Sequence, residues 1–139
     1  RRNMQTIKFE LFMKKILLMA LACMLISVGQ AQEADKAQIK FAETIHHFDT
    51  LVQGDEAVCW FEFANEGTEP LLVTSAFSSC GCTVPEWSKE PIAPKQHGRI
   101  KVWYNTNKTG DFNKAVVVKT NSATEKNVVL RIKGVVTKQ

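Results

Sequence analysis

The sequence predicts an all-β fold: an immunoglobulin-like antiparallel β-sandwich of about seven strands over residues 39–137, preceded by a cleavable signal peptide. Three observations lead to this prediction. Short segments in which apolar and polar side chains alternate recur along the chain. Turn-forming residues separate these segments at intervals of about 8–12 residues. Beyond the N-terminal leader, no segment shows the period of an amphipathic helix.

Seven segments carry the strand pattern: 39–41, 45–52, 57–65, 71–77, 99–105, 112–120 and 128–136. The third is the clearest, because Cys59, Phe61 and Phe63 fall on one face of a strand while the residues between them fall on the other. The last two segments are separated by one turn, so we expect them to pair as a hairpin.

Glycine and proline mark the breaks between strands. Four glycines are expected at structural turns, since glycine adopts backbone angles that other residues avoid: Gly67, Gly81, Gly98 and Gly110. Proline has no N–H to donate to a neighbouring strand. Three prolines therefore keep residues 83–98 out of any central strand: Pro85, Pro91 and Pro94.

The N-terminal leader has the pattern of a bacterial export signal. Met13 is followed by two lysines and by an apolar run over 16–28, and Gly29-Gln30-Ala31 supplies the small residues that a signal peptidase reads. We therefore expect a signal peptide over 13–31, cleaved after Ala31, and a flexible polar tether over 32–38. Residues 1–12 stand outside this pattern. We interpret them as upstream translation from a misassigned start, and the alternative is a longer charged region that begins at Met4.

This leader places the mature chain in the periplasm or outside the cell. The apolar run is shorter than the ~20 residues that a membrane span needs, and no later run is long enough, so the mature chain should contain no transmembrane span. Cys23 raises the alternative of a lipid anchor. Of the residues just before it, only Ala22 fits a lipobox, and the apolar run continues past it, so lipid anchoring through Cys23 is disfavoured.

The charge of the mature chain argues against a nucleic-acid partner. The whole chain has 18 Lys and Arg residues and 14 Asp and Glu residues, a net charge of +4. The leader contains five of these basic residues and one of the acidic residues, which leaves 13 of each in residues 32–139. The mature chain is therefore neutral, and it lacks the clustered basic face that is typical of nucleic-acid binding.

The most distinctive motif is Cys80-Gly81-Cys82. Together with Cys59 it gives the mature chain an odd number of cysteines, so at least one thiol stays unpaired in an oxidising compartment. A bridge between Cys80 and Cys82 requires a turn at Gly81, because two residues along an extended strand span ~7 Å. Pairing of either one with Cys59 stays open, although Cys59 is expected to be a small buried apolar residue. A bridged pair could be a conformational clasp or, if strained and exposed, a redox centre.

A soft metal is the other chemistry that two thiolates allow. They suit copper or zinc, and His97 could complete such a site. A structural zinc site usually has four ligands and two to four residues between its cysteines, whereas one residue separates Cys80 and Cys82 and no second pair follows. His46 and His47 are adjacent on a predicted strand, so at most one could contribute. We therefore expect no cofactor, with copper or zinc at Cys80, Cys82 and His97 as the alternative.

No catalytic constellation is readable, so an enzyme is not expected. Three serines cluster near the cysteines without the signature of a nucleophile elbow: Ser75, Ser78 and Ser79. The acidic residues are scattered, and there is no phosphate-binding glycine loop.

The segment with Pro85, Trp87 and Pro91 is a candidate partner-binding loop. An exposed tryptophan in a proline-rich loop could anchor an envelope protein or a glycan. The alternative is that Trp87 folds over the end of the sandwich. Trp60 and Trp103 lie within predicted strands and are expected to be packing residues.

Several segments resemble a known family. FEFANEG at 61–67 resembles its F-x-F-x-N-x-G signature, and CGCTVPEW at 80–87 is its most specific element. Pro70-Leu71 and residues 100–106, 110–112 and 132–136 complete the match. Over residues 39–136 the chain thus resembles a secreted Bacteroidetes-type protein of the domain-of-unknown-function family DUF1573. The resemblance implies export and an immunoglobulin-like sandwich, and no established activity.

One departure from the family pattern is visible. Where the resemblance predicts Asp-Phe-Gly near the second strand, this chain has His47-Phe48-Asp49, so the local turn geometry is expected to differ. The sequence as a whole favours an exported, non-enzymatic immunoglobulin-like module with a binding or structural role at the cell envelope. The alternative is a thiol-disulfide or soft-metal protein that acts through Cys80 and Cys82. The loop that carries both cysteines and Trp87 is the expected functional end.

Overall fold

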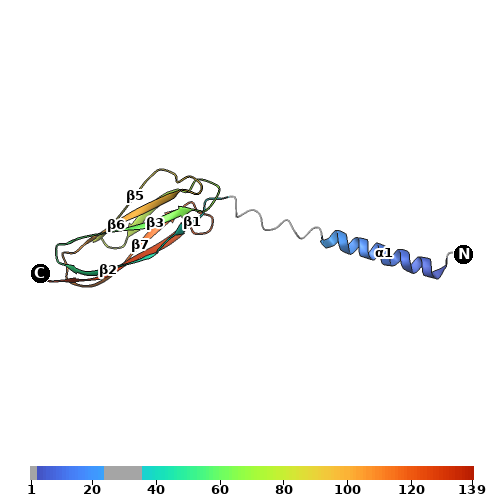
Figure 1. The fold of residues 1–139 in the computed structure, drawn as a ribbon, viewed down its shortest axis with the longest axis horizontal. Helices are drawn as coiled ribbons and strands as arrows, with labels where there is room; N and C mark the ends of the chain where they lie inside the picture. Colours follow the sequence, from blue (N-terminus) through green and yellow to red (C-terminus); the bar gives the residue numbers. More distant parts are fainter. Residues whose placement is uncertain (1–2, 24–35) are drawn as a thin grey trace. The chain divides into compact units, whose positions relative to one another are not determined.

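The computed structural model describes residues 3–23 and 36–139 and contains a helical unit and a strand domain (Figure 1). Helix α1 (Met4–Cys23) joins residues on both sides of Met13 in one continuous helix, and its side chains through residue 19 are exposed. Among the described residues, no helix is both long and apolar enough to cross a membrane. The predicted cleavage site at Ala31 lies outside the described residues, so the signal peptide stays a prediction.

The strand domain is a sandwich of two four-stranded sheets. Its strands are β1 (Ile39–Phe41), β2 (Ile45–Val52), β3 (Glu56–Asn65), β4 (Val73–Ser78), β5 (Thr83–Trp87), β6 (His97–Asn105), β7 (Gly110–Thr120) and β8 (Asn127–Thr137). Sheet A has the order β1-β3-β6-β5, and sheet B has the order β2-β8-β7-β4. This architecture confirms the predicted all-β sandwich.

Strand β5 corrects the expectation that Pro85 and Trp87 lie in a loop. The prolines do exclude a central strand, because β5 is an edge strand of sheet A and, among the described strands, pairs with β6 alone. An edge strand tolerates Pro85, since only one of its sides belongs to a hydrogen-bonded ladder. The described domain therefore has eight strands, one more than the sequence predicts.

The direction of one strand pair also differs from the prediction. The other pairs are antiparallel, including the predicted hairpin of β7 and β8, but β2 runs parallel to β8. A bulge interrupts this pair between His47 and Thr50. It coincides with the segment where the sequence departs from the family pattern.

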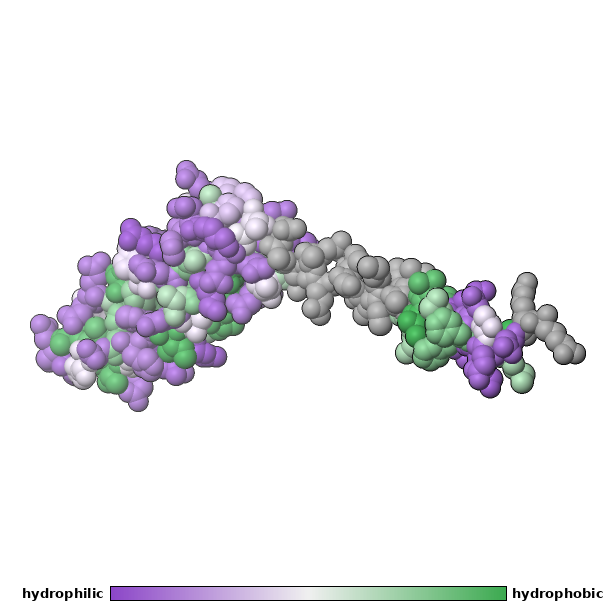
Figure 2. Space-filling view, turned by 45° about the vertical axis from the view of Figure 1, so that its right-hand side comes forward, coloured by the Kyte–Doolittle hydropathy of each residue, from purple (hydrophilic) through white to green (hydrophobic). Residues whose placement is uncertain are grey.

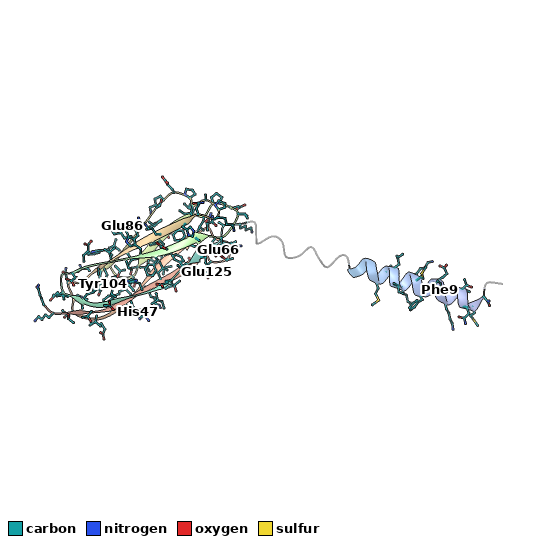
Figure 3. The ribbon with its side chains drawn as sticks, in the orientation of Figure 1. Phe9, His47, Glu66, Glu86, Tyr104 and Glu125 are labelled. Carbon is teal, nitrogen blue, oxygen red and sulfur yellow. A yellow bond between two sulfur atoms is a disulfide. The ribbon has the colours of Figure 1, made fainter. Side chains whose placement is uncertain are left out.

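Apolar side chains from both sheets fill the space between them. Phe61, Ile100 and Leu130 are fully buried there, and each such side chain contributes about 1.5–3 kcal/mol relative to an exposed position. Tyr104 of β6, labelled in Figure 3, stacks on Phe112 of β7 with ring centroids 4.0 Å apart. The alternation of β3 thus places its inner residues in the core, as predicted.

The FEFANEG segment has a structural explanation. Asn65, which is fully buried, accepts hydrogen bonds at Oδ1 from the N–H groups of Gln38 (3.3 Å) and Gly67 (3.0 Å). Its Nδ2 donates to the carbonyls of Glu69 (2.7 Å) and Ile92 (3.0 Å). The side chain therefore bonds four backbone groups from three segments of the chain at one end of the sandwich.

The predicted glycine turns have different outcomes. Gly110 begins β7 with φ 111°, a conformation that favours glycine. Gly67 lies in the turn after β3, where a Cβ would come within 1.9 Å of the Lys36 carbonyl oxygen. Gly81 lies in the turn between β4 and β5. Gly98 is not in a turn: it lies within β6 opposite Phe63, whose ring occupies the space that a side chain would need.

Candidate functional site

The Cys80-Gly81-Cys82 segment is the turn by which the chain crosses from sheet B to sheet A. It connects β4 to β5, the edge strands of the two sheets. A disulfide joins Cys80 to Cys82, whose Cα atoms are 5.2 Å apart. Two further contacts support the turn: the N–H of Thr83 donates to the Cys80 carbonyl (3.2 Å), and the N–H of Asn105 donates to the Cys82 carbonyl (2.8 Å). The disulfide therefore tightens the crossing between the sheets.

Cys59 takes no part in this bridge. Its side chain is only 3% exposed and lies in the core among the inner residues of β3. Burial raises the pKa of the Cys59 thiol to about 12, because the core disfavours the charged thiolate. Of the pairings that the sequence leaves open, the structure contains Cys80 with Cys82, and Cys59 is a protonated apolar residue.

The structure does not bring the three proposed metal ligands together. Cys82 precedes Thr83, which pairs with Tyr104 near the end of β6, whereas His97 begins β6. The length of β6 separates these positions by about 26 Å. Among the described residues, no group of three His, Cys, Asp or Glu side chains is placed to hold a metal ion.

The predicted partner-binding loop is also rearranged. Pro85 and Trp87 belong to β5, and Pro91 lies exposed in the connection to β6. Trp87 is half-buried, its indole N–H donates to the Val73 carbonyl (3.1 Å), and the Lys89 ammonium lies 3.1 Å from the centroid of its ring. Trp87 thus packs against the edge of the sandwich, which is the structural alternative that the sequence allows.

The cysteines and Trp87 do not form one functional end. They lie at opposite ends of β5, and five residues of extended strand separate Cys82 from Trp87 by about 16 Å. The expectation of a shared functional loop is therefore corrected.

The outer face of sheet A is the feature that the sequence interpretation missed. Trp60 of β3 and Trp103 of β6 are 47% and 36% exposed, instead of packed in the core. Trp103 lies between Val58 of β3 and Val84 of β5, so an apolar row crosses three strands. The residues on either side of each tryptophan are apolar and buried, and successive residues of a strand face opposite sides. The sequence pattern therefore indicated that both tryptophans point outward.

Charged residues of both signs surround this apolar row. The Arg99 guanidinium lies 4.2 Å from the centroid of the Trp60 ring, and Glu62 is opposite Arg99 on the neighbouring strand. Lys101 forms an ion pair with Glu86 of β5 (3.6 Å; Glu86 is labelled in Figure 3). On the face visible in Figure 2, hydrophobic side chains likewise form patches between hydrophilic ones. The outer face of sheet A thus combines flat apolar groups with donors and acceptors.

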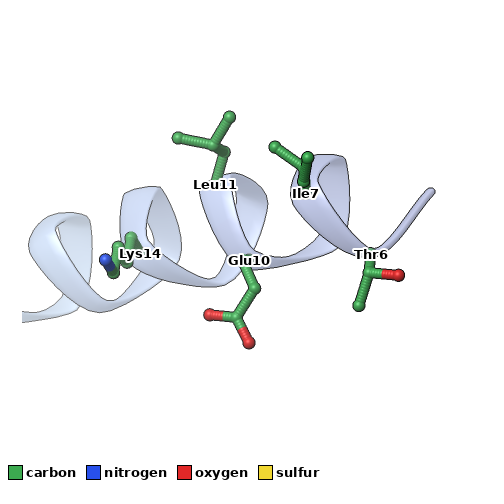
Figure 4. A pocket seen from close by; sticks show the side chains of 5 residues that line it. All are labelled: Thr6, Ile7, Glu10, Leu11 and Lys14. Atoms are coloured by element: carbon green, nitrogen blue, oxygen red, sulfur yellow. The ribbon is translucent and has the colours of Figure 1, made fainter. Parts of the chain in front are cut away.

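Helix α1 has a separate hollow along its surface, which we do not interpret as a ligand-binding site. It is lined by Thr6, Ile7, Glu10, Leu11 and Lys14 (Figure 4). In the close-up, Ile7 and Leu11 point to one side of the helix and Thr6 and Glu10 to the other. These lining residues come from one helix, so in the described part of the chain no second element encloses a ligand there.

Comparisons with solved structures agree with the fold. The chain is similar to a protein of unknown function from Porphyromonas gingivalis W83 (TM-score 0.66, 12% identity, covering 78% of this chain and 51% of that one). It is also similar to the ASH/PapD-like domain 7 of human CEP192 (TM-score 0.58, 12% identity, 83% and 94% covered) and to the Vibrio cholerae VesB protease (TM-score 0.60, 13% identity, 70% and 32% covered).

At these identities the likeness shows the fold alone. The chain spans about half the length of the Porphyromonas gingivalis chain and about a third of VesB. A comparison with curated proteins gives no match. The model of the family described as "Protein of unknown function (DUF1573)" matches residues 39–136, which run from β1 into β8. This immunoglobulin-like sandwich therefore belongs to the DUF1573 family.

Proposed function

We propose that this protein is an exported, non-enzymatic module that binds a partner at the cell envelope through the outer face of sheet A. One observation carries the proposal: Trp60 and Trp103 are exposed on the two inner strands of a sheet. Contiguous exposed apolar surface marks interaction sites, and tryptophan is enriched among the residues that dominate binding energy. Because β3 and β6 are each paired on both sides, the face is formed before a partner arrives.

The outer face of sheet B provides a natural comparison. Phe77, Val117 and Val129 form an apolar row across β4, β7 and β8, and Phe77 and Val129 are each 47% exposed. This row has the same geometry but lacks tryptophan. It therefore tests whether binding depends on the aromatic face or on exposed apolar surface in general.

Co-sedimentation with the cell-envelope fraction of the bacterium that naturally produces the protein tests the proposal. The Trp60→Ala Trp103→Ala chain should lose about tenfold or more in affinity, whereas the matched Phe77→Ala Val129→Ala chain should bind like the wild type. Circular dichroism and urea unfolding verify that both chains fold. Equal binding by the tryptophan variant and the wild type would overturn the proposal, as would equal losses in both variants.

Thiol-disulfide exchange through Cys80 and Cys82 is the second candidate function. The observation that favours it is the position of the disulfide in an open turn: both cysteines are half-buried, and apart from these two neighbours no described residue lies within 4 Å of the Cβ position at the exposed Gly81. A substrate thiolate would attack one sulfur and release the other as a thiolate. A second substrate thiolate would then resolve the mixed disulfide, leaving an oxidised substrate and two cysteine thiols.

Equilibration with glutathione buffers distinguishes this candidate from a clasp. A redox protein should have a reduction potential near that of oxidising folding catalysts, on the order of −120 to −200 mV. A structural disulfide typically resists reduction and lies below about −300 mV. A potential below about −300 mV would mean that the Cys80–Cys82 disulfide serves to stabilise the turn between β4 and β5.

A further inference from the structure

Residues from all four strands of sheet A line a series of hollows that we treat together as one cross-strand groove. It consists of three adjoining hollows of about 420, 240 and 360 Å³. The first and second share His97, Gly98 and Arg99, and the second and third share Glu62 and His97. This cross-strand groove therefore runs from β5 over β6 and β3 to β1. Four strands at a spacing of about 4.8 Å give it a length of about 14 Å.

Its lining changes from aromatic to charged along this path. Trp87 and Trp60 line the end at β5. Arg99 and Glu62 line the middle, and Lys40 lines the end at β1. With Lys101 and Glu86 in the first hollow, three cations and two carboxylates share the groove, and one pair of them is joined by a salt bridge. Its charge is close to balanced.

We propose that the cross-strand groove binds a neutral, linear glycan, an inference that rests on the proposed binding function of this face. A peptide laid across the strands cannot extend the sheet, because β3 and β6 are already paired on both sides. Recognition therefore falls to side chains. The Arg99 guanidinium lies over the Trp60 ring, and the surface of the indole that stays exposed can pack against the apolar C–H face of a sugar ring, which excludes water from both.

The charged residues fit the rest of a sugar. A hydroxyl both donates and accepts hydrogen bonds, so it can accept from Arg99 and donate to Glu62 at the same site. A neutral ligand leaves the ion pair of Lys101 and Glu86 intact, whereas a polyanion would be placed against the carboxylates of Glu62 and Glu86. The length of the groove matches several sugar units in a row and exceeds that of a monosaccharide. Charge balance, aromatic surface and length thus point to the same class of ligand.

Affinity electrophoresis in gels that contain soluble polysaccharide tests this inference. The neutral probes are hydroxyethyl cellulose, xylan, galactomannan and laminarin, and polygalacturonate is the anionic probe. At least one neutral probe should retard the purified chain. Trp60→Ala and Arg99→Ala should weaken that binding by about tenfold or more. Phe77→Ala is the matched control, because Phe77 is an exposed aromatic residue on sheet B and does not line the groove. It should change the affinity by less than about twofold.

The possible failures are distinguishable. Retardation by polygalacturonate alone would overturn the neutral-glycan inference, and so would equal losses in Trp60→Ala and Phe77→Ala. If no probe binds while envelope binding still depends on the two tryptophans, the glycan inference fails and the proposed function stands. If envelope binding is independent of both tryptophans, the proposed function fails with it.

Discussion

The indole N–H of Trp87 donates a hydrogen bond to the carbonyl of Val73, at 3.1 Å, and so joins the edge strands of the two sheets. Val73 begins β4 and Trp87 ends β5, while the disulfide turn connects the other ends of these strands. The two edge strands β4 and β5 are therefore connected at both of their ends, by the Trp87–Val73 hydrogen bond and by the disulfide turn. This arrangement gives a structural role to the motif that is most distinctive in the sequence.

Replacing Trp87 with Phe keeps an aromatic ring and removes the N–H donor. We expect the free energy of unfolding to fall by about 1 kcal/mol, the typical net contribution of one hydrogen bond. Urea unfolding measures the change. Trp103→Phe is the matched control, since its ring is exposed, and it should stay within about 0.5 kcal/mol of the wild type. Equal effects of the two substitutions would contradict the assigned bond.

Asn65→Ala should lower the free energy of unfolding much more than Trp87→Phe does. It leaves the buried N–H of Gly67 and the carbonyls of Glu69 and Ile92 without their side-chain partner. The Ile92 carbonyl keeps the N–H of Leu71 as a donor (2.8 Å), whereas the buried N–H of Gly67 loses its side-chain acceptor at a cost of about 1–3 kcal/mol, so we expect a total loss of about 2–4 kcal/mol. Asn127→Ala, at an exposed position in β8, should cost less than about 0.5 kcal/mol in the same unfolding experiment. A tolerant Asn65→Ala chain would show that Asn65 does not hold this end together.

Cys59 predicts a pH dependence of stability. The thiol has a pKa of about 12 in the folded chain and about 9.0 when unperturbed. Below pH 9 it is protonated in both states, and its contribution to stability is complete. Between about pH 9 and pH 12 the unfolded chain loses this proton while the folded chain keeps it. The free energy of unfolding should therefore fall as the pH rises, by at most about 1.4 kcal/mol per pH unit.

The Cys59→Ala variant isolates this effect, because lysine and tyrosine titrations are common to both chains. Unfolding at pH 8 and pH 11 should show a smaller loss of stability in Cys59→Ala than in the wild type. Parallel slopes would contradict the assignment of a buried, protonated thiol.

The intact mass of the protein recovered from the periplasm tests export and the disulfide together. Cleavage after Ala31 predicts a chain that begins at Gln32. Alkylation of the unfolded chain without reductant should modify one cysteine, Cys59, and alkylation after reduction should modify all three. A lipid-modified Cys23 at the N-terminus would contradict the predicted cleavage, and three modified cysteines without reductant would contradict the Cys80–Cys82 bridge.

Local alternation explains what could be predicted from the sequence. It places Phe61 and Phe63 inside the sandwich because adjacent residues of a strand face opposite sides. The same alternation directs Trp60 outward, although its size suggested a packing role. Alternation carries no information on which strand is the neighbour or in which direction it runs. The parallel pairing of β2 with β8, which is distant in the sequence, could therefore not be predicted.

The site was harder to predict for a similar reason. Cys82 and Trp87 are five positions apart in the sequence, and the interpretation as a loop made them neighbours in space. The edge position of β5, which permits Pro85 within a strand, places them far apart instead. The cross-strand groove depends on residues such as Lys40 and Arg99, which come from different strands and line adjoining hollows only because of the strand order of sheet A.

A single comparison of two double variants tests the central claim. The claim is that the outer face of sheet A binds the envelope partner, whereas the disulfide stabilises the fold. The disulfide closes a very short loop, so its removal in the Cys80→Ser Cys82→Ser chain should lower the free energy of unfolding by about 1–2 kcal/mol. We predict that this chain still sediments with the envelope fraction like the wild type, whereas Trp60→Ala Trp103→Ala does not. Loss of binding in the serine variant at unchanged fold, with binding retained in the tryptophan variant, would contradict the account and move the function to the cysteines.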